Sequence, residues 1–410
     1  MTALVRSALL LLGVPSLAFA QTVRQLPPAA DAPPAVPAND AVLVVDATGA
    51  GDFLEVSDAI AAALPRTLVL VRAGTYTAPV AIRGVGLTLQ ADAGAAVTLT
   101  EGLVVEDVAA GHGVVVAGMT LAGGFTIDGC EGTVRLDRCT TPPSGPIAPP
   151  PPGTTYWNWP NCGFGLSYQC VRDSEAVTIV DCEFHGADGV SMFPDGAPGH
   201  HGLQVELSTV ALYHTILRGG EGYPATSTGH YPVASGAGGD GLRVRGADSV
   251  VRHCGLDAVG GLGGTHTGTG TFAVTFGCDG IAIRSHSLST VEACVTDDLL
   301  FDVDSIVRGG ELPWYTIEAP PQAPVYLMLA ARSDWRTFAP ASGILHLGSR
   351  AKVVPLGVMP ASGTLHRPLP TAGPASILGH VRVELQVYAR VQGIDRYSEP
   401  RTIVVVDPGL

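Results

Sequence analysis

The sequence has little positive charge. It contains 23 Lys and Arg residues against 37 Asp and Glu, and its only lysine is Lys352, which leaves a formal net charge of −14. Because nucleic-acid phosphates are bound by clustered Lys and Arg, this composition argues against a nucleic-acid partner. It also weighs against direct binding of polyanionic sugars.

Long apolar runs are absent after the first residues, so the sequence predicts no membrane-spanning helix beyond them. Arg6, the apolar run Ala8–Leu12 and the small-x-small end Ala18–Ala20 are typical of a signal peptide over residues 1–20. We therefore expect an exported chain that begins at Gln21, lies outside the cell or on its surface, and has no membrane span after cleavage.

The eight cysteines contain no C-x-x-C pair, so they carry no zinc signature. Two closely spaced pairs are disulfide candidates in an exported protein: Cys130 with Cys139, and Cys162 with Cys170. A regular slot after successive predicted strands offers a second interpretation, a structural ladder of small packed side chains. Its members are Cys139, Cys182, Thr215, Cys254 and Cys294.

Residues 21–40 are rich in Pro and Ala and predict an extended linker. A strand at 42–45 and a helix from Val56 to Ala63 then predict a cap over the end of a sheet stack. The motif residues of this block are Gly51-Asp52-Phe53, Val56, Ala59-Ile60, Val71 and Gly74-Thr75-Tyr76. They resemble the N-terminal region of the pectin-lyase-like superfamily, particularly pectin methylesterases, over roughly 40 residues. The resemblance implies a right-handed parallel β-helix.

Short strands separated by Gly- and Asp-bearing turns recur from residue 80 to 136, which is typical of β-helix coils. Beyond residue 164, four similar strand starts are spaced by 37, 39 and 39 residues: Gly165-Leu166, Gly202-Leu203, Gly241-Leu242 and Gly280-Ile281. Glycine-rich stretches at 219–239 and 260–270 predict flexible loops between them. This arrangement looks like the glycine-loop β-helix proteins exported by environmental bacteria.

The predicted fold class is all-β. Residues 41–312 form a right-handed single-stranded parallel β-helix with an N-terminal helical cap, interrupted by a Pro- and aromatic-rich insertion at 142–164. Residues 313–410, with longer alternating strands, form an antiparallel β-sandwich that serves as an accessory domain.

The catalytic sets of known β-helix enzymes are not readable in order. Gly111-His112-Gly113 and Asp297-Asp298 match parts of the polygalacturonase set, but in reverse order. The pectin methylesterase D-F-I-F-G pattern is missing. We assign no catalytic residues from the sequence.

Two weaker patterns suggest binding. Asp188, Asp240 and Asp279 each precede a glycine, and arginines such as Arg243 and Arg284 lie on nearby strands. Converging carboxylates would hold Ca²⁺, as in pectate-lyase chemistry, although Asp-Gly also forms ordinary turns. Tyr156, Trp157 and Trp159 lie in a Pro-flanked stretch and are candidates for stacking on sugar rings.

Three functions fit these observations. The first is a non-catalytic secreted or surface-displayed scaffold that binds an extracellular polysaccharide or a cell-envelope component. The second is a Ca²⁺-dependent polysaccharide lyase or a glycoside hydrolase that acts on extracellular glycans. The third is a structural envelope protein.

Overall fold

The computed structural model describes residues 41–143, 169–192, 195–226, 233–267, 274–294, 299–308, 311, 313–330, 333–337, 344–347, 351–369 and 380–406. The signal peptide and linker predicted for residues 1–40 lie outside these ranges, as does nearly all of the predicted insertion.

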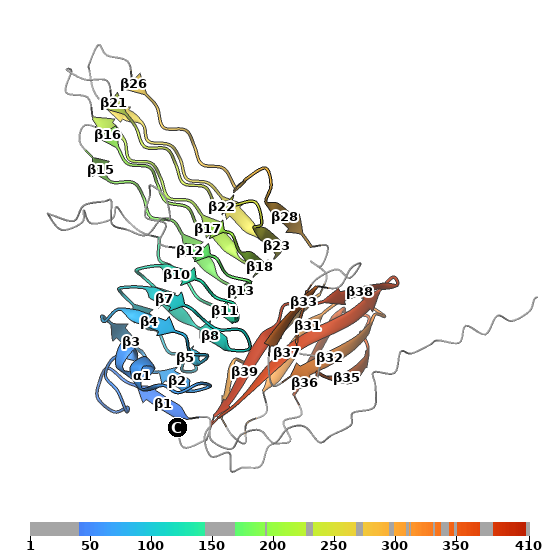
Figure 1. Ribbon diagram of the computed structural model, residues 1–410. Helices are drawn as coiled ribbons and strands as arrows, with labels where there is room; N and C mark the ends of the chain where they lie inside the picture. Colours follow the sequence, from blue (N-terminus) through green and yellow to red (C-terminus); the bar gives the residue numbers. More distant parts are fainter. Residues whose placement is uncertain are drawn as a thin grey trace, which may run out of the picture. The chain divides into compact units, whose positions relative to one another are not determined.

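A long parallel sheet, sheet A, carries nine strands in the order β1-β2-β5-β8-β11-β13-β18-β23-β28 (Figure 1). In that order they span Val42–Val45, Leu68–Val71, Thr88–Ala91, Gly113–Ala117, Thr133–Asp137, Ala176–Val180, Thr209–Tyr213, Val250–Cys254 and Thr290–Ala293. Most are short and rich in Val, Leu and Ile, as expected for parallel strands with both faces covered.

Two further parallel sheets accompany it. Sheet C has seven strands in the order β27-β22-β17-β12-β10-β7-β4. They span Ile283–Ser285, Leu242–Arg245, Leu203–Glu206, Gln169–Arg172, Phe125–Asp128, Leu103–Glu106 and Val80–Arg83. Sheet B consists of β3-β6-β9 (Gly74–Tyr76, Val97–Leu99, Met119–Leu121) and β14-β19-β24 (Glu183–His185, Ile216–Arg218, Asp257–Val259). Single bridges through Thr140 join the two parts.

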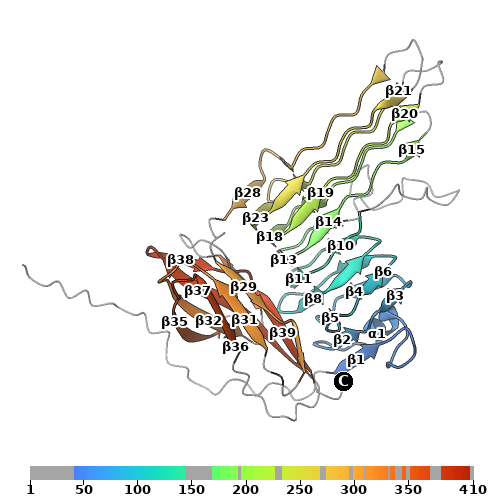
Figure 2. The ribbon, with the colours of Figure 1, turned by 180° about the vertical axis from the view of Figure 1, so that it is seen from behind.

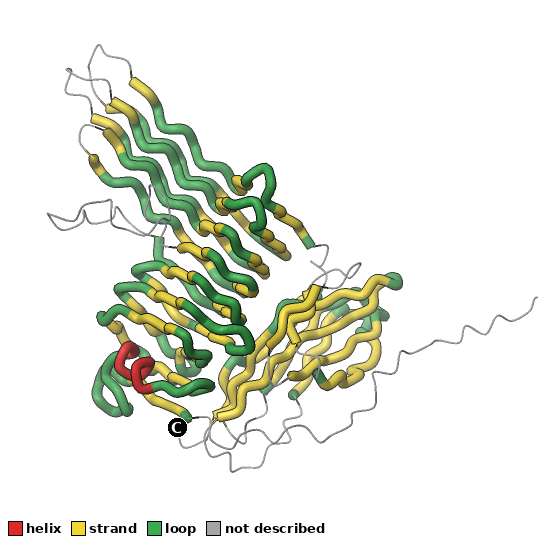
Figure 3. The backbone as a smooth tube through the Cα atoms, viewed as in Figure 1, coloured by secondary structure: helices red, strands yellow, loops and turns green. Residues whose placement is uncertain are grey.

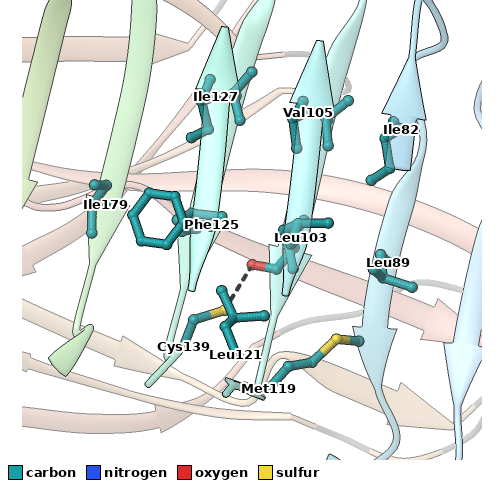
Figure 4. Close-up of a cluster of buried hydrophobic side chains, with 14 of the residues drawn as sticks. Ile82, Leu89, Leu103, Val105, Met119, Leu121, Phe125, Ile127, Cys139 and Ile179 are labelled. Atoms are coloured by element: carbon teal, nitrogen blue, oxygen red, sulfur yellow. Dashed lines mark hydrogen bonds between the residues drawn. The ribbon is translucent and has the colours of Figure 1, made fainter. Parts of the chain in front are cut away.

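The chain visits sheets A, B and C in the same order in successive repeats, for example β5, β6 and β7 and then β8, β9 and β10. Within each strand alternate side chains point inward, and those of successive repeats form one continuous core (Figure 4). Phe125 and Phe184 meet there, with ring centroids 4.8 Å apart. This all-β arrangement of stacked parallel sheets is compatible with a parallel β-helix.

The single helix in the described part of the chain is α1, Val56–Ala62. Its apolar spacing places Val56, Ala59 and Ile60 on one buried face, which packs against β1, β2 and β4 (Figure 1). The helix therefore forms where its sequence pattern predicts it.

The glycine-rich stretches are not loose loops. They form outgoing segments at 186–192, 219–226 and 260–267 and returning segments at 195–202, 233–241 and 274–282, which lie side by side in both ribbon views (Figures 1 and 2). Most of their length has no regular strand, as the tube view shows (Figure 3). We call these segments the glycine layers.

Short strand pairs occur toward the turns of the glycine layers. β15 (Ser191–Met192) pairs antiparallel with β16 (Asp195–Gly196). β20 (Ala225–Thr226) pairs with β25 (His266–Thr267), and β21 (Val233–Ala234) pairs with β26 (Val274–Thr275), both in parallel. Successive stretches therefore keep one register even where they are furthest from sheets A, B and C.

Backbone hydrogen bonds run across the glycine layers from one segment to the next. Gly220 N–H donates to the His200 carbonyl, Gly239 N–H to that of Gly220, and Gly261 N–H to that of Gly239, each at 2.8 Å. Gly196, Gly199 and Gly202 recur every third residue, the period of a polyproline II helix, which has no internal hydrogen bonds and so must satisfy its backbone groups elsewhere. The prediction of flexible loops is therefore wrong for the described residues.

Close approach explains why these positions are glycine. A Cβ atom on Gly239 would lie 1.8 Å from the His200 carbonyl oxygen, and one on Gly261 would lie 2.0 Å from that of Gly220. Among the described glycines of these segments, none has a φ in the left-handed region. The requirement is thus space between neighbouring segments and not an unusual backbone conformation.

Mainly antiparallel sheets follow. Sheet D has the order β29-β31-β36 (Leu300–Val303, Trp314–Glu318, Thr364–Pro368). Sheet E has the order β30-β39-β37-β32-β35 (Ile306–Arg308, Arg401–Val406, His380–Val391, Pro324–Ala330, Lys352–Val358), with β38 (Ile394–Tyr397) paired to β37. β33 (Ser333–Thr337) pairs with β34 (Ile344–Leu347). Among the described strands of sheets D and E, the parallel pair is β30 with β39.

Sheets D and E share a second core, to which D contributes Phe301 and Tyr315 and E contributes Leu327 and Val387. Strands β29 and β30 precede residue 313, where the sequence predicts a domain boundary, yet they pair with β31 and β39 beyond it. The stacked parallel sheets therefore end with β28 at Ala293, and sheets D and E begin with β29 at Leu300, although β30 still pairs with β39 in parallel.

The outer face of sheet A contacts sheet E through both apolar and charged groups, and the described residues belong to one compact unit. Leu68 and Leu70 pack with Ile306, Val404 and Val406. Arg135 on β11 pairs with Glu384 on β37 at 2.7 Å, and both side chains are buried. The two regions are therefore joined by a desolvated ion pair as well as by apolar contacts.

Candidate functional site

The chemically richest described cluster lies where the returning glycine segments enter sheet C. The strand register aligns Gln204, Arg243 and Arg284 on β17, β22 and β27. Asp240, which precedes β22 and is buried, accepts hydrogen bonds from Arg284 Nε at 2.8 Å and from the Ile281 N–H at 3.1 Å. Burial by itself raises the pKa of Asp240, but these donors lower it below its ordinary value.

His201 completes this cluster. The Asp240 N–H donates to its Nδ1 at 2.9 Å, and Arg243 Nη1 lies 2.8 Å from its Nε2. Burial and the positive charge of Arg243 together lower the pKa of His201 to about 4, so the ring is neutral near pH 7. In this arrangement each oxygen of Asp240 already has a donor, and the cluster serves as a packed ion pair at the base of the glycine layers.

The three aspartates predicted to bind calcium do not converge. Asp188 accepts the Glu221 N–H at 2.8 Å, and Asp279, which is exposed, accepts the Gly263 N–H at 2.7 Å. Among the described residues, no group of three His, Cys, Asp or Glu side chains is placed to hold a metal ion. Each carboxylate instead accepts a backbone N–H from a neighbouring segment distant in sequence, so these aspartates link segments of the glycine layers.

The aromatic candidates Tyr156, Trp157 and Trp159 lie outside the described residues, as do Cys162 and the Asp297-Asp298 pair. Cys170, the predicted partner of Cys162, is buried on β12.

The predicted ladder of small side chains is present at its first three positions. Cys139, Cys182 and Thr215 each lie two residues beyond a sheet A strand and donate to the carbonyl two residues back, at 3.5, 3.2 and 3.0 Å. The Cys139 N–H in turn donates to the Cys182 sulfur at 3.3 Å. These side chains form a buried ladder at one corner of the stack.

Cys254 and Cys294 do not belong to this ladder. The register aligns Cys254 with Tyr213, two residues before the slot, so its side chain lies on the outer face of sheet A with Val180 and Ala211. Cys294 follows β28 next to it, and the two form a disulfide across a Cα separation of 5.2 Å. The sequence spacing was misleading because Cys254 is the last residue of β23. Cys139 and Cys182, in contrast, lie two residues after the ends of β11 and β13.

The predicted disulfide between Cys130 and Cys139 is wrong. Cys130 follows β10 in sheet C and Cys139 follows β11 in sheet A, so the two lie at different corners, and both are free thiols. Cys130 belongs to a second ladder: the Cys130 N–H donates to Ser174 Oγ at 3.2 Å and the Ser174 N–H to Ser208 Oγ at 3.1 Å. The recurrence of Cys or Ser two residues after three successive sheet C strands, β10, β12 and β17, was the available sequence signal.

The strand repeat also needs correction at its ends. Leu203 and Leu242 begin paired strands as predicted, but Leu242 is aligned with Ile283 and not with Ile281. Gly280 and Ile281 belong to the last returning glycine segment, where the Gly241 N–H donates to the Ile281 carbonyl at 3.0 Å. Gly165-Leu166 lies outside the described residues. In the described part of the chain, the strand before β17 in sheet C is β12, which begins at Gln169.

Sequence reasoning also passed over an exposed aromatic group on sheet D. Trp314, at the start of β31, is 49% exposed and stacks on His366 of β36, with ring centroids 4.8 Å apart and planes within 12°. The alternation of β31, in which Tyr315 and Ile317 are buried, was the signal that would place Trp314 on the outer face.

These observations define an all-β protein with long parallel sheets, a layered glycine-rich region and a pair of mainly antiparallel sheets. In the part of the chain that the structure describes, no helix has the length and apolar character needed to cross a membrane. A scan against models of protein families finds no match, and a search of curated proteins finds no significant relative.

Proposed function

We propose that this chain is an exported, non-catalytic scaffold that binds an extracellular polysaccharide or another component of the cell envelope. Its body is a right-handed parallel β-helix of the pectin-lyase type with α1 as its cap, and sheets D and E form an accessory β-sandwich. The repeated A, B, C order of strands and the packing of α1 on β1, β2 and β4 support this fold.

The observation that carries the proposal is the ordered packing of the glycine layers. Their segments are held by backbone hydrogen bonds across contacts too close for a Cβ, so most of this region has no side chains between layers that could perform chemistry. A rigid projection of this kind suits presentation of a binding surface, because binding is favoured when the surface is ordered in advance.

The charges support the same reading. A lyase needs a metal-bound uronate and a free cationic base. Arg284, a candidate base, is hydrogen bonded to Asp240, and the three predicted calcium ligands are apart. The net charge of −14 adds a general repulsion of polyuronates.

The test is to incubate the full exported chain with neutral and acidic glycans, with Ca²⁺ or with EDTA, and to follow unsaturated products by ultraviolet absorbance and new reducing ends by a colour assay. We expect binding of at least one glycan and no turnover. Calcium-dependent product formation that disappears in Asp240→Asn but persists in Asp58→Asn, an acidic site on α1, would show that the protein is a lyase.

A further inference from the structure

The outer face of sheet D carries an aromatic ring within a set of polar side chains. Strand alternation turns Phe301, Tyr315, Ile317 and Leu365 into the core and leaves their neighbours on the other face. The register then places Asp302, Thr316 and His366 in one row across the three strands. Trp314 is in the adjoining position on β31, opposite Pro368.

The ring at the edge of this face is held in place. Trp314 stacks on His366, and Thr316 Oγ1 lies 3.0 Å from His366 Nδ1, so the imidazole that supports the indole is itself positioned. Large exposed aromatic side chains on a rigid sheet lose little entropy when they bind a ligand. Trp314 is therefore an ordered apolar surface that is half exposed to solvent.

The polar groups around Trp314 match the hydroxyl groups of a sugar. Asp302 and Glu318 are exposed carboxylates that can accept hydrogen bonds from hydroxyls, and Thr316 and Thr364 can donate or accept. A pyranose ring has an apolar C–H face for the indole and hydroxyls at its edge for these groups. Two carboxylates on this face, on a chain of net charge −14, repel a polyanion and favour an uncharged sugar.

We infer that the outer face of sheet D, centred on Trp314 with Asp302, Thr316, Glu318 and His366, is a binding site for a neutral polysaccharide. This inference rests on the proposed binding function and gives it a location. This surface on sheet D is separate from the one that the glycine layers present and from the 156–159 segment.

The test uses the full exported chain in affinity gel electrophoresis and calorimetry with hydroxyethylcellulose, xyloglucan and galactomannan as neutral probes and polygalacturonate as the acidic one. We expect a neutral probe to bind and polygalacturonate not to bind. Trp314→Ala should weaken neutral binding by about tenfold or more, Trp314→Phe should restore part of it, and Asp302→Asn should weaken it several-fold. Phe276→Ala, a substitution of another exposed aromatic residue, on a returning glycine segment, should leave it unchanged.

Three outcomes would overturn the site: binding unaffected by Trp314→Ala, preference for polygalacturonate, or no binding of any neutral probe. Neutral binding that survives Trp314→Ala but is lost in the Trp157→Ala, Trp159→Ala double variant would overturn this location while leaving the scaffold proposal intact. Turnover of a glycan together with loss of binding in Trp314→Ala would support this location but contradict the proposal of a non-catalytic scaffold. Unchanged circular dichroism and melting temperature of each variant exclude misfolding.

Discussion

At the residue scale, the contact between sheets A and E depends on buried charges that satisfy one another. Arg401 on β39 is almost fully buried and donates to Glu399 at 3.0 Å and to the Phe301 carbonyl at 2.8 Å. It also donates to Asp181, which directly follows β13 of sheet A. The surrounding carboxylates raise the pKa of Arg401 further, although burial opposes this. A buried charge group of this kind is costly to break on one side, because the remaining partners stay desolvated and unpaired.

Substitution of Arg401 should therefore be severe. We expect Arg401→Met to reduce the free energy of unfolding by about 3 kcal/mol or more, since buried Glu399 would lose its guanidinium partner. Urea unfolding followed by circular dichroism measures the change. Arg390→Met breaks an exposed pair with Asp395 and should cost less than about 1 kcal/mol. Equal effects in the two variants would contradict the role assigned to Arg401.

At the element scale, the glycine layers show how extended segments without side-chain contacts become ordered. Many backbone donors find a carbonyl on a neighbouring segment, for example Gly199 N–H to Ala237 and Gly238 N–H to Cys278, at 2.8 and 2.9 Å. The stability of the layers thus depends on the distance between backbones. Any side chain between them separates several hydrogen-bonded neighbours at once.

Addition of one methyl group tests this. Gly239→Ala should destabilise the protein by about 3 kcal/mol or more, because its Cβ would overlap a backbone oxygen that cannot move without breaking the next hydrogen bond. Hydrogen exchange should show faster exchange along residues 199–202 and 260–264 than in wild type. Ala237→Ser, an exposed position on the same segment, is the control. Normal protection of the glycine layers in Gly239→Ala would refute this packing.

At the scale of the whole molecule, stability depends on ionisable groups whose pKa values burial and neighbouring charged groups have moved in different directions. Burial lowers the pKa of His200 and of His201 to about 4. The hydrogen bond to Asp181 raises the pKa of His214. For Asp181, burial acts to raise the pKa, but His214 and Arg401 lower it to about 2.

We therefore expect the free energy of unfolding to fall as pH decreases from about 6.5 to 4. In this window the unfolded chain binds protons at His200 and His201 that the folded protein does not, so their contribution is present above the unfolded pKa and lost on acidification. His214 acts in the opposite sense: its contribution is complete below the unfolded pKa and lost as pH rises through the folded one. Asp181 adds a further loss as pH falls from about 4 toward 2.

Denaturant unfolding at a series of pH values measures this dependence. His201→Gln should reduce the loss of unfolding free energy between pH 6.5 and 4 by on the order of 3 kcal/mol, since glutamine has no group that titrates in this range. His112→Gln, which replaces a histidine at an exposed position, is the control variant. A His201→Gln slope as steep as that of wild type would refute the assignment.

The local periodicities predicted well. The helical spacing of Val56, Ala59 and Ile60 and the short apolar strands from Val80 to Leu136 correspond to α1 and to strands of the parallel sheets, because the burial of a side chain follows directly from its position along a helix or strand. The candidate sites were less predictable. Asp240 was selected as a calcium ligand, but its partners Arg284 and His201 come from segments about 40 residues away on either side.

The sequence by itself thus determined the class of structure, since all-β composition, glycine punctuation and short apolar strands are local properties. Only the tertiary structure decided the register, which moved Cys254 from a buried ladder to a disulfide on the outer face and separated Cys130 from Cys139. It also showed that the glycine-rich stretches are ordered, because the space that requires each glycine is created by a carbonyl on another segment. Such a requirement arises only once distant segments are in contact.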